Sequence, residues 1–61
     1  MVLVSSDGRY HGHTEDRTVA TNQAKNVKGD ARILSNEDWE KVVANPLQRA
    51  ELCGTLGEKI A

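Results

Sequence analysis

The segment from Leu34 to Trp39 constrains the fold of this chain most, because it contains a complete start signal for an α-helix. Ser35 is a favourable N-cap residue, and Glu37 and Asp38 place negative charge in the first helical turn. Leu34 and Trp39 occupy the two positions of a hydrophobic staple, which fixes the angle at which the chain enters the helix. The segment therefore predicts a helix after Ser35, but it specifies no chemistry.

A second helix is predicted to follow at a proline corner. Proline disfavours the helical conformation in the residue before it and suits the first helical position. Asn45 is therefore expected as N-cap, Pro46 as the first helical residue and Gln48 as the partner in a capping box. Apolar residues of 46–60 recur at spacings of three or four, which predicts one stripe: Leu47, Ala50, Cys53, Leu56 and Ile60. Leu52, beside Leu56, widens this stripe.

Two glycines interrupt this second helical pattern. Gly54 and Gly57 each cost about 1 kcal/mol relative to alanine inside a helix. The helix therefore either frays after Cys53 or uses these small residues where another backbone comes close.

The first half of the chain predicts short β-strands. Residues 2–5 and 9–15 flank Asp7-Gly8, a pair that suits a two-residue turn, so a hairpin is expected. Residues 17–21 contain little apolar content and are expected to form an edge strand or a loop. Residues 22–30 are polar and show no periodicity, which predicts a mobile loop. Residues 31–34 form either a short strand or a lead into the helix.

These elements predict an α+β protein in which an N-terminal β-hairpin or three-stranded meander packs on two C-terminal helices. The 61 residues allow one small domain, with a strand-rich half (1–34) and a helical half (35–61). With 38% apolar residues, one Trp, one Tyr and no Phe, its core is marginal. The lone Cys53 excludes an intramolecular disulfide, so we expect support from a partner chain, most simply as a homodimer.

The charge of the chain selects no class of partner. Its net charge is −1, divided as +1 in residues 1–34 (five basic, four acidic) and −2 in residues 35–61 (three basic, five acidic). The short apolar run 2–4 is far below the length of a signal-peptide core or a membrane span, and a single Cys agrees with a reducing compartment. We therefore expect a cytoplasmic protein without a membrane partner.

A metal site is one chemical hypothesis for the first half. In a strand, His11, His13 and Glu15 would share one face, and two imidazoles with a carboxylate suit zinc or non-haem iron. The outer two groups would lie about 13 Å apart along an extended strand, so closing on one ion requires a bend or another chain. The alternative interpretation is a solvated polar face of a hairpin.

Catalysis is a second hypothesis. Cys53 with His11 or His13 and Asp16 would supply the residue types of a nucleophilic triad. Cys53 nevertheless falls on an apolar stripe, where a thiol usually serves as a small buried hydrophobic group. We therefore expect no enzymatic activity and no cofactor.

Nucleic-acid binding is a third hypothesis. Arg9, Arg17, Lys25 and Lys28 could contact phosphates, and Tyr10 could stack on a base. Interleaved acidic residues cancel most of that field, which favours an ordinary surface of mixed charge.

The leading hypothesis is a non-enzymatic protein-interaction module, a small regulator or inhibitor that docks an apolar helical face on a partner protein. Two helices and a thin sheet either bury all of their apolar stripes or leave a surplus that can dock. Large apolar side chains dominate such contacts, and the expected anchors are Trp39, Val42, Leu47, Leu52 and Leu56.

One family resemblance accompanies this hypothesis. Residues 33–40, ILSNEDWE, with Asn45-Pro46 and the segment 47–60, resemble the carboxy-terminal segments of some bacterial antitoxins. In those segments a helix start of the form LS-x-E-D-[W/Y]-E leads to a proline corner and a toxin-neutralising helix. The resemblance covers at most residues 33–60, and residues 1–32 show no ribbon-helix-helix pattern. It implies an antitoxin-like protein whose tail binds a toxin, although glycines at 54 and 57 are unusual in a long inhibitory helix.

Overall fold

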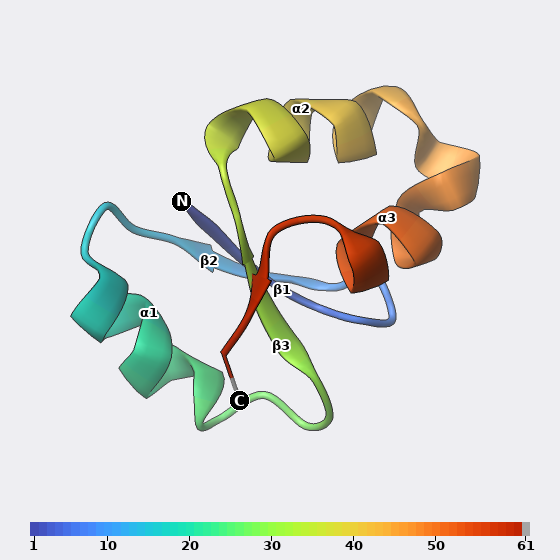
Figure 1. Cartoon of the computed structure of the whole chain (residues 1–61). Helices are drawn as coiled ribbons and strands as arrows, with labels where there is room; N and C mark the ends of the chain where they lie inside the picture. Colours follow the sequence, from blue (N-terminus) through green and yellow to red (C-terminus); the bar gives the residue numbers. More distant parts are fainter. Residues whose placement is uncertain (61) are drawn as a thin grey trace.

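The computed structural model describes residues 1–60 as an antiparallel sheet with helices on both of its faces (Figure 1). The strands are β1 (Val2–Ser5), β2 (Tyr10–His13), β3 (Ala31–Leu34) and β4 (Glu58–Lys59). The helices are α1 (Arg17–Ala24), α2 (Asn36–Ala44), the 3-10 helix η1 (Pro46–Gln48) and α3 (Arg49–Thr55). The sheet order is β2-β1-β3-β4, and every neighbouring pair is antiparallel. The predicted α+β class and the helix joint at the proline are confirmed.

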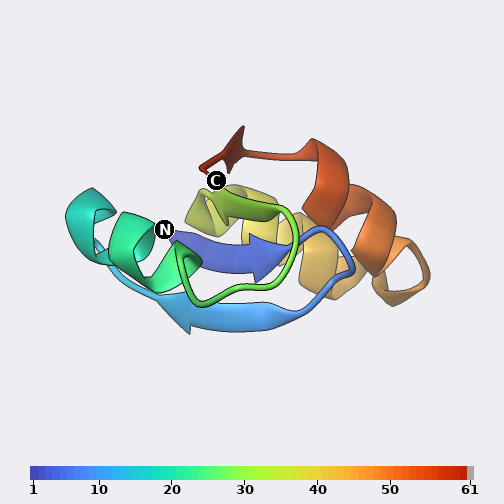
Figure 2. The same cartoon turned by 90° about the horizontal axis from the view of Figure 1, so that it is seen from below.

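Strand β1 forms the centre of the core, because side chains from helices cover both of its faces. Val2 and Val4 point toward α2 and α3 and belong to a cluster that includes Val42 and Cys53. Leu3 points to the opposite face and packs with Ala24 of α1. In the view of Figure 2, α1 and the pair α2 and α3 lie on different sides of β1. The run of apolar residues in β1 therefore reflects burial on both faces.

The hairpin loop is one residue longer than the predicted turn. The Ser5 N–H donates to the Arg9 carbonyl oxygen at 3.0 Å, and the Gly8 N–H donates to the Ser5 carbonyl oxygen at 3.0 Å. Gly8 has a φ of +94°, as the last position of a three-residue hairpin loop requires. The hairpin itself is confirmed, with residues 6–8 rather than two residues in its loop.

A bulge in β2 changes which of its residues share a face. Val4 pairs with Tyr10 and Leu3 pairs with Gly12, so His11 is the extra residue between two successive pairs. Tyr10 therefore lies on the face of Val4.

Helix α1 corrects the prediction of a strand or loop over 17–21 and of a loop that begins at residue 22. The Asp16 carboxylate accepts a hydrogen bond from the Thr18 N–H at 2.8 Å, which caps the first turn. Ala20 and Ala24 are buried one turn apart, and their small side chains let the helix lie close to the sheet. The prediction failed because this helix buries alanines rather than large apolar residues.

Helix α2 follows the prediction at its start and differs at its end. The Ser35 hydroxyl accepts a hydrogen bond from the Asp38 N–H at 3.1 Å, which confirms the N-cap. The predicted capping box at the corner is wrong, because the Asn45 side-chain amide donates back to the Lys41 carbonyl oxygen at 2.8 Å. Neither Asn45 nor Gln48 caps the following helix with its side chain.

The helical part of the C-terminal segment is shorter than the helix predicted over residues 46–60. Its α-helical part covers Arg49–Thr55 and is followed by strand β4. A Cβ atom on Gly57 would lie 2.1 Å from the Ile33 carbonyl oxygen, so this glycine is needed where two backbones meet. Arg32 holds the same turn: its guanidinium donates to the carbonyl oxygens of Leu56 (2.8 Å), Gly57 (3.1 Å) and Thr55 (3.3 Å). The sequence left two explanations for the glycines, fraying of the helix or close approach of another backbone. Close approach of another backbone applies to Gly57.

Candidate functional site

The five predicted anchor residues lie in three different environments. Val42 is fully buried and belongs to the core. Trp39, Leu52 and Leu56 are partly buried and pack against that core. Leu47 alone is fully exposed, with a relative exposure of 101%. Four of the five predicted anchors therefore pack in or against the core of their own chain. Leu47 is the one whose side chain is fully accessible to a partner.

The region of the corner between α2 and η1 carries the two most exposed large apolar side chains of the described residues, Leu47 and Val43. Val43, on the last turn of α2, is 57% exposed and lies close in sequence to Leu47. The chain around the corner also forms an open hollow, lined by Ala44, Asn45, Pro46, Leu47 and Gln48. We call Val43, Ala44, Pro46 and Leu47 the corner patch. In the sequence, Trp39, Val42 and Val43 recur at helical spacings of three and four from Trp39, and this pattern is the signal that could have added Val43 to the anchors.

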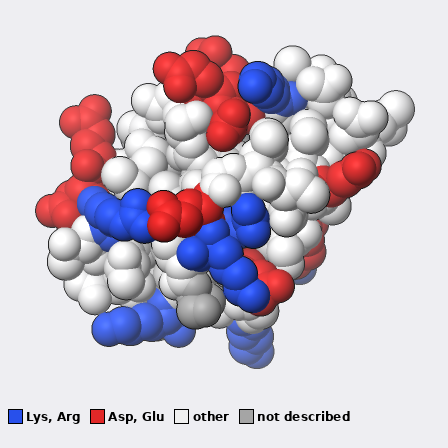
Figure 3. Space-filling model, in the orientation of Figure 1, with Lys and Arg blue, Asp and Glu red and all other residues white. Residues whose placement is uncertain are grey.

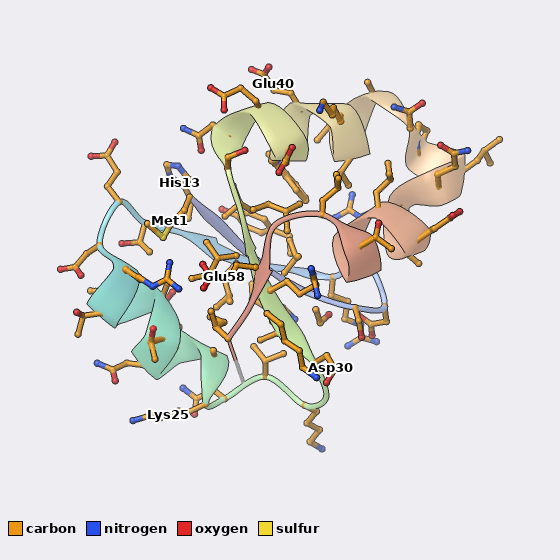
Figure 4. The ribbon with its side chains drawn as sticks, in the orientation of Figure 1. Met1, His13, Lys25, Asp30, Glu40 and Glu58 are labelled. Atoms are coloured by element: carbon orange, nitrogen blue, oxygen red, sulfur yellow. The ribbon has the colours of Figure 1, made fainter. Side chains whose placement is uncertain are left out.

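A second hollow lies between β2 and the start of α2. The rings of Tyr10 and Trp39 form a tilted pair, with centroids 5.4 Å apart and planes at 40°. The Arg49 guanidinium lies over the Trp39 ring, with its central carbon 5.2 Å from the centroid. The lining of this aromatic hollow combines apolar, aromatic and polar groups: Val2, Tyr10, His13, Asn36, Trp39 and Glu40. Figure 4 shows His13 near the N-terminus and Glu40 projecting from α2. Sequence reasoning did not connect these residues, because the bulge in β2 brings Tyr10 and His13 to one face.

The three predicted metal ligands are not brought together. The bulge places His13 in the aromatic hollow, whereas His11 lines a different, polar hollow. Glu15 follows β2 in a bend and lies outside the strand. Within residues 1–60, no group of three His, Cys, Asp or Glu side chains is arranged to hold a metal ion.

Cys53 lies on α3 and is buried in the core, in one cluster with Val4, Leu34 and Val42. Burial raises the pKa of its thiol above the ordinary value, and the nearby positive charge of Arg49 offsets this only in part. The other charge that acts on the thiol is that of Asp7. An inaccessible thiol held in its neutral form has the opposite properties of an activated nucleophile.

The residues proposed for nucleic-acid binding are divided over the molecule. Arg17 pairs with Glu58 at 2.7 Å, and Arg9 lies 3.6 Å from Asp7. Tyr10 lies in the aromatic hollow, whereas Lys25 lines a separate hollow beside α1. Arg9 and Lys28 do meet, together with His11, in the polar hollow, whose remaining lining residues are Ser5, Asp7 and Asn26. Figure 3 shows basic and acidic groups interspersed over the face that it displays.

The Asp7 carboxylate in the polar hollow is held by its own loop. It accepts hydrogen bonds from the Ser5 hydroxyl and from the Arg9 N–H. The Ser5 hydrogen bond is the largest cause that lowers the pKa of Asp7 below its ordinary value. Asp7 therefore remains negatively charged at neutral pH and partly cancels the charge of Arg9.

No helix of residues 1–60 has both the length and the apolar composition needed to cross a membrane. Comparison of the chain with protein-family models, with curated proteins and with solved structures gives no match. The chemistry of the surface is therefore the basis for a functional proposal.

Proposed function

We propose that this protein is a non-enzymatic protein-interaction module, a small regulator or inhibitor, that docks its corner patch on a partner protein. The observation that carries the proposal is the complete exposure of Leu47, beside Val43 at 57%. Leaving a leucine in water forgoes about 1.5–3 kcal/mol that its burial would supply. The 3-10 helix η1, which begins at Pro46, presents the Leu47 side chain away from the core, as an anchor for a partner requires.

The proposed role uses none of the residues of the catalytic hypothesis. The thiol of Cys53 is buried, and the two histidines line separate hollows. We also propose a cytoplasmic location, because a reducing compartment keeps a single thiol free.

Self-association is one form that this docking can take. A stable interface covers about 800 Å² on each partner, which is about a fifth of the 3954 Å² accessible surface of this chain. The corner patch is smaller than such an interface and would form its apolar centre. Light scattering at two protein concentrations, with the wild type and Leu47→Ser, identifies a homodimer that depends on this patch.

A photocrosslinking side chain introduced at position 47 tests docking on another protein. The same side chain at position 51, an exposed polar site on α3, is the matched control. A protein captured only from position 47 is then purified and titrated with the wild type and with Leu47→Ser. We expect the substitution to weaken binding about tenfold, since it removes most of the burial free energy of one leucine. Equal affinity of the two proteins, with unchanged melting temperatures, would contradict the proposal.

An antitoxin-like, toxin-neutralising protein is the alternative proposal. It implies a long inhibitory helix after the corner, whereas α3 has 7 residues and is followed by a strand of the sheet. Docking through the corner patch does not depend on that helix.

A further inference from the structure

Strand β2 is an open edge of the sheet. It stands first in the order β2-β1-β3-β4, and no other strand of residues 1–60 pairs with its outer side. Three of its four residues are exposed, including Tyr10 at 49%. A strand edge carries unpaired N–H and C=O groups, which a folded protein either shields or uses to bind an extended segment.

The aromatic hollow lies beside this open edge. Tyr10 and His13 of β2 both face it because of the bulge at His11. Side chains of an added strand would alternate between the two faces of the sheet, so one of them would reach Trp39 and Glu40. The edge can therefore supply backbone hydrogen bonds, and the hollow can supply selectivity for a side chain.

The charge of the hollow favours a basic side chain. Glu40 is the one acidic residue of the lining, which includes no lysine or arginine. Glu37 lies one turn earlier on α2, and Glu15 follows β2. These three carboxylates form no ion pair within the part of the chain that the structure describes. Two positive groups also border the hollow: the Arg49 guanidinium over Trp39, and the Met1 ammonium, which donates to the Thr14 carbonyl oxygen at 2.9 Å. The three carboxylates therefore leave a small excess of negative charge for an approaching cation.

The aromatic rings add a second reason for a cation. The Arg49 guanidinium already occupies a face of the Trp39 ring, so the Tyr10 ring is the one that remains open to a second cation. The neighbouring Tyr10 ring is half exposed and presents the same kind of electron-rich face. Together with Glu40, it offers a lysine or arginine both cation–π contact and a charged partner.

We propose that the open edge of β2 binds an extended, basic segment of a partner protein, which adds as a strand and places a lysine or arginine in the aromatic hollow. This surface is separate from the corner patch, because the linings of the two hollows have no residue in common. Failure of one proposal therefore leaves the other standing, and Leu47→Ser should not change peptide binding at β2.

Trp39 makes the test direct, since it is the single tryptophan of the chain. The probe is a short blocked peptide in which threonine alternates with valine and the central residue is lysine. It is titrated against the full chain while Trp39 fluorescence and the backbone amide shifts of residues 10–13 are recorded. We expect saturable changes at both, and at least about fivefold weaker binding of the same peptide with a central glutamate. A peptide with prolines in place of the valines should not bind, because proline donates no backbone hydrogen bond.

Two matched variants separate charge from folding. Glu40→Gln should weaken the lysine peptide about two- to fivefold, whereas Glu51→Gln, at an exposed site on α3, should leave it unchanged. Three results would overturn the proposal: no shifts in residues 10–13 at millimolar peptide, equal binding of the lysine and glutamate peptides, or occupation of β2 by a second copy of this chain. A dimer in light scattering of the peptide-free protein that persists in Leu47→Ser, with amide shifts of residues 10–13 that change on dilution, identifies that last outcome.

Discussion

Arg49 connects Trp39 to the hairpin loop through two different interactions. Its guanidinium carbon lies 5.2 Å from the Trp39 ring centroid, and its Nε donates to the Gly8 carbonyl oxygen at 2.6 Å. One side chain of α3 therefore joins α2 to the loop between β1 and β2, over a sequence separation of 41 residues to Gly8. Such a contact positions the aromatic hollow as well as the C-terminal helix.

Replacement of Arg49 by lysine should lower the free energy of unfolding by about 1–2 kcal/mol. A lysine retains the charge but cannot reproduce the planar stacking and the directed Nε hydrogen bond together. Urea denaturation followed by Trp39 fluorescence measures the change. Arg9→Lys is the control, because Arg9 makes an exposed ion pair, and its effect should stay within about 0.5 kcal/mol. Equal losses in the two variants would show that the Trp39 contact adds no stability.

The helix that sequence reasoning missed shows how small residues can determine an element. The pattern from Arg17 to Ala24 lacks large apolar side chains, so its periodicity is weak. The signals that do identify α1 are the Asp16 cap and the pair Ala20 and Ala24, whose spacing of four places both on one face. Helix α2 was predictable because its cap and its large apolar residues agree.

The aromatic hollow could not be predicted from the sequence, because it depends on one irregularity of backbone pairing. In a regular strand, His11 and His13 would share a face and Tyr10 would lie opposite them. The bulge at His11 shifts the alternation by one residue, so the Tyr10 side chain lies on the same face of the sheet as that of His13. The local signal is Gly12, which directly follows the extra residue and has a φ of +152°, since a glycine inside a strand often marks a bulge. It does not specify which neighbouring residue is the extra one.

Replacement of Gly57 by alanine should be considerably more destabilising than the same change at Gly29. Both glycines have positive φ angles, +71° and +90°, so alanine is strained by about 1–2 kcal/mol at either position. At Gly29 nothing lies within 4 Å of the added Cβ, whereas at Gly57 it would lie 2.1 Å from the Ile33 carbonyl oxygen. We expect a further loss of about 1–3 kcal/mol at Gly57, because the backbones of β3 and the turn must separate.

Thermal and urea denaturation of both glycine variants measure this difference. Hydrogen exchange of the Ile60 amide, which donates to the Ala31 carbonyl oxygen at 3.0 Å, reports whether the C-terminal strand has detached. Faster exchange should appear in Gly57→Ala alone. Equal stability of the two variants would mean that the close approach to Ile33 is relieved without cost.

Removal of the Ser5 hydroxyl should raise the pKa of Asp7. The hydrogen bond from Ser5 favours the charged carboxylate and is the main reason that the pKa of Asp7 lies below its ordinary value of 3.8. Because the folded pKa is lowered, the associated stability is present above pH 3.8 and is lost as the pH falls through the folded value. In Ser5→Ala this acid-sensitive contribution should shrink.

Carbon NMR of the Asp7 carboxyl during an acid titration measures this pKa directly. Asp30 is an internal control, because its carboxylate pairs with Lys59 and makes no contact with Ser5 in the hydrogen bonds of the described chain. A wild-type titration that already matches Ser5→Ala would contradict the role of the hydroxyl.

The burial of Cys53 predicts a thiol that reacts only when the chain opens. Its side chain is fully buried in the cluster of Val4 and Leu34, and burial raises its pKa above the ordinary value of 9.0. An iodoacetamide reaction at pH 8 should therefore be at least about a hundredfold slower in the native protein than in urea, since modification must await unfolding. The raised pKa also makes stability pH-dependent: the contribution is complete below pH 9.0 and is lost as the pH rises through the folded value. Cys53→Ala should lack this alkaline loss. Rapid labelling of the native thiol would show instead that α2 and α3 separate readily from the sheet, and that the core below Trp39 is open to solvent.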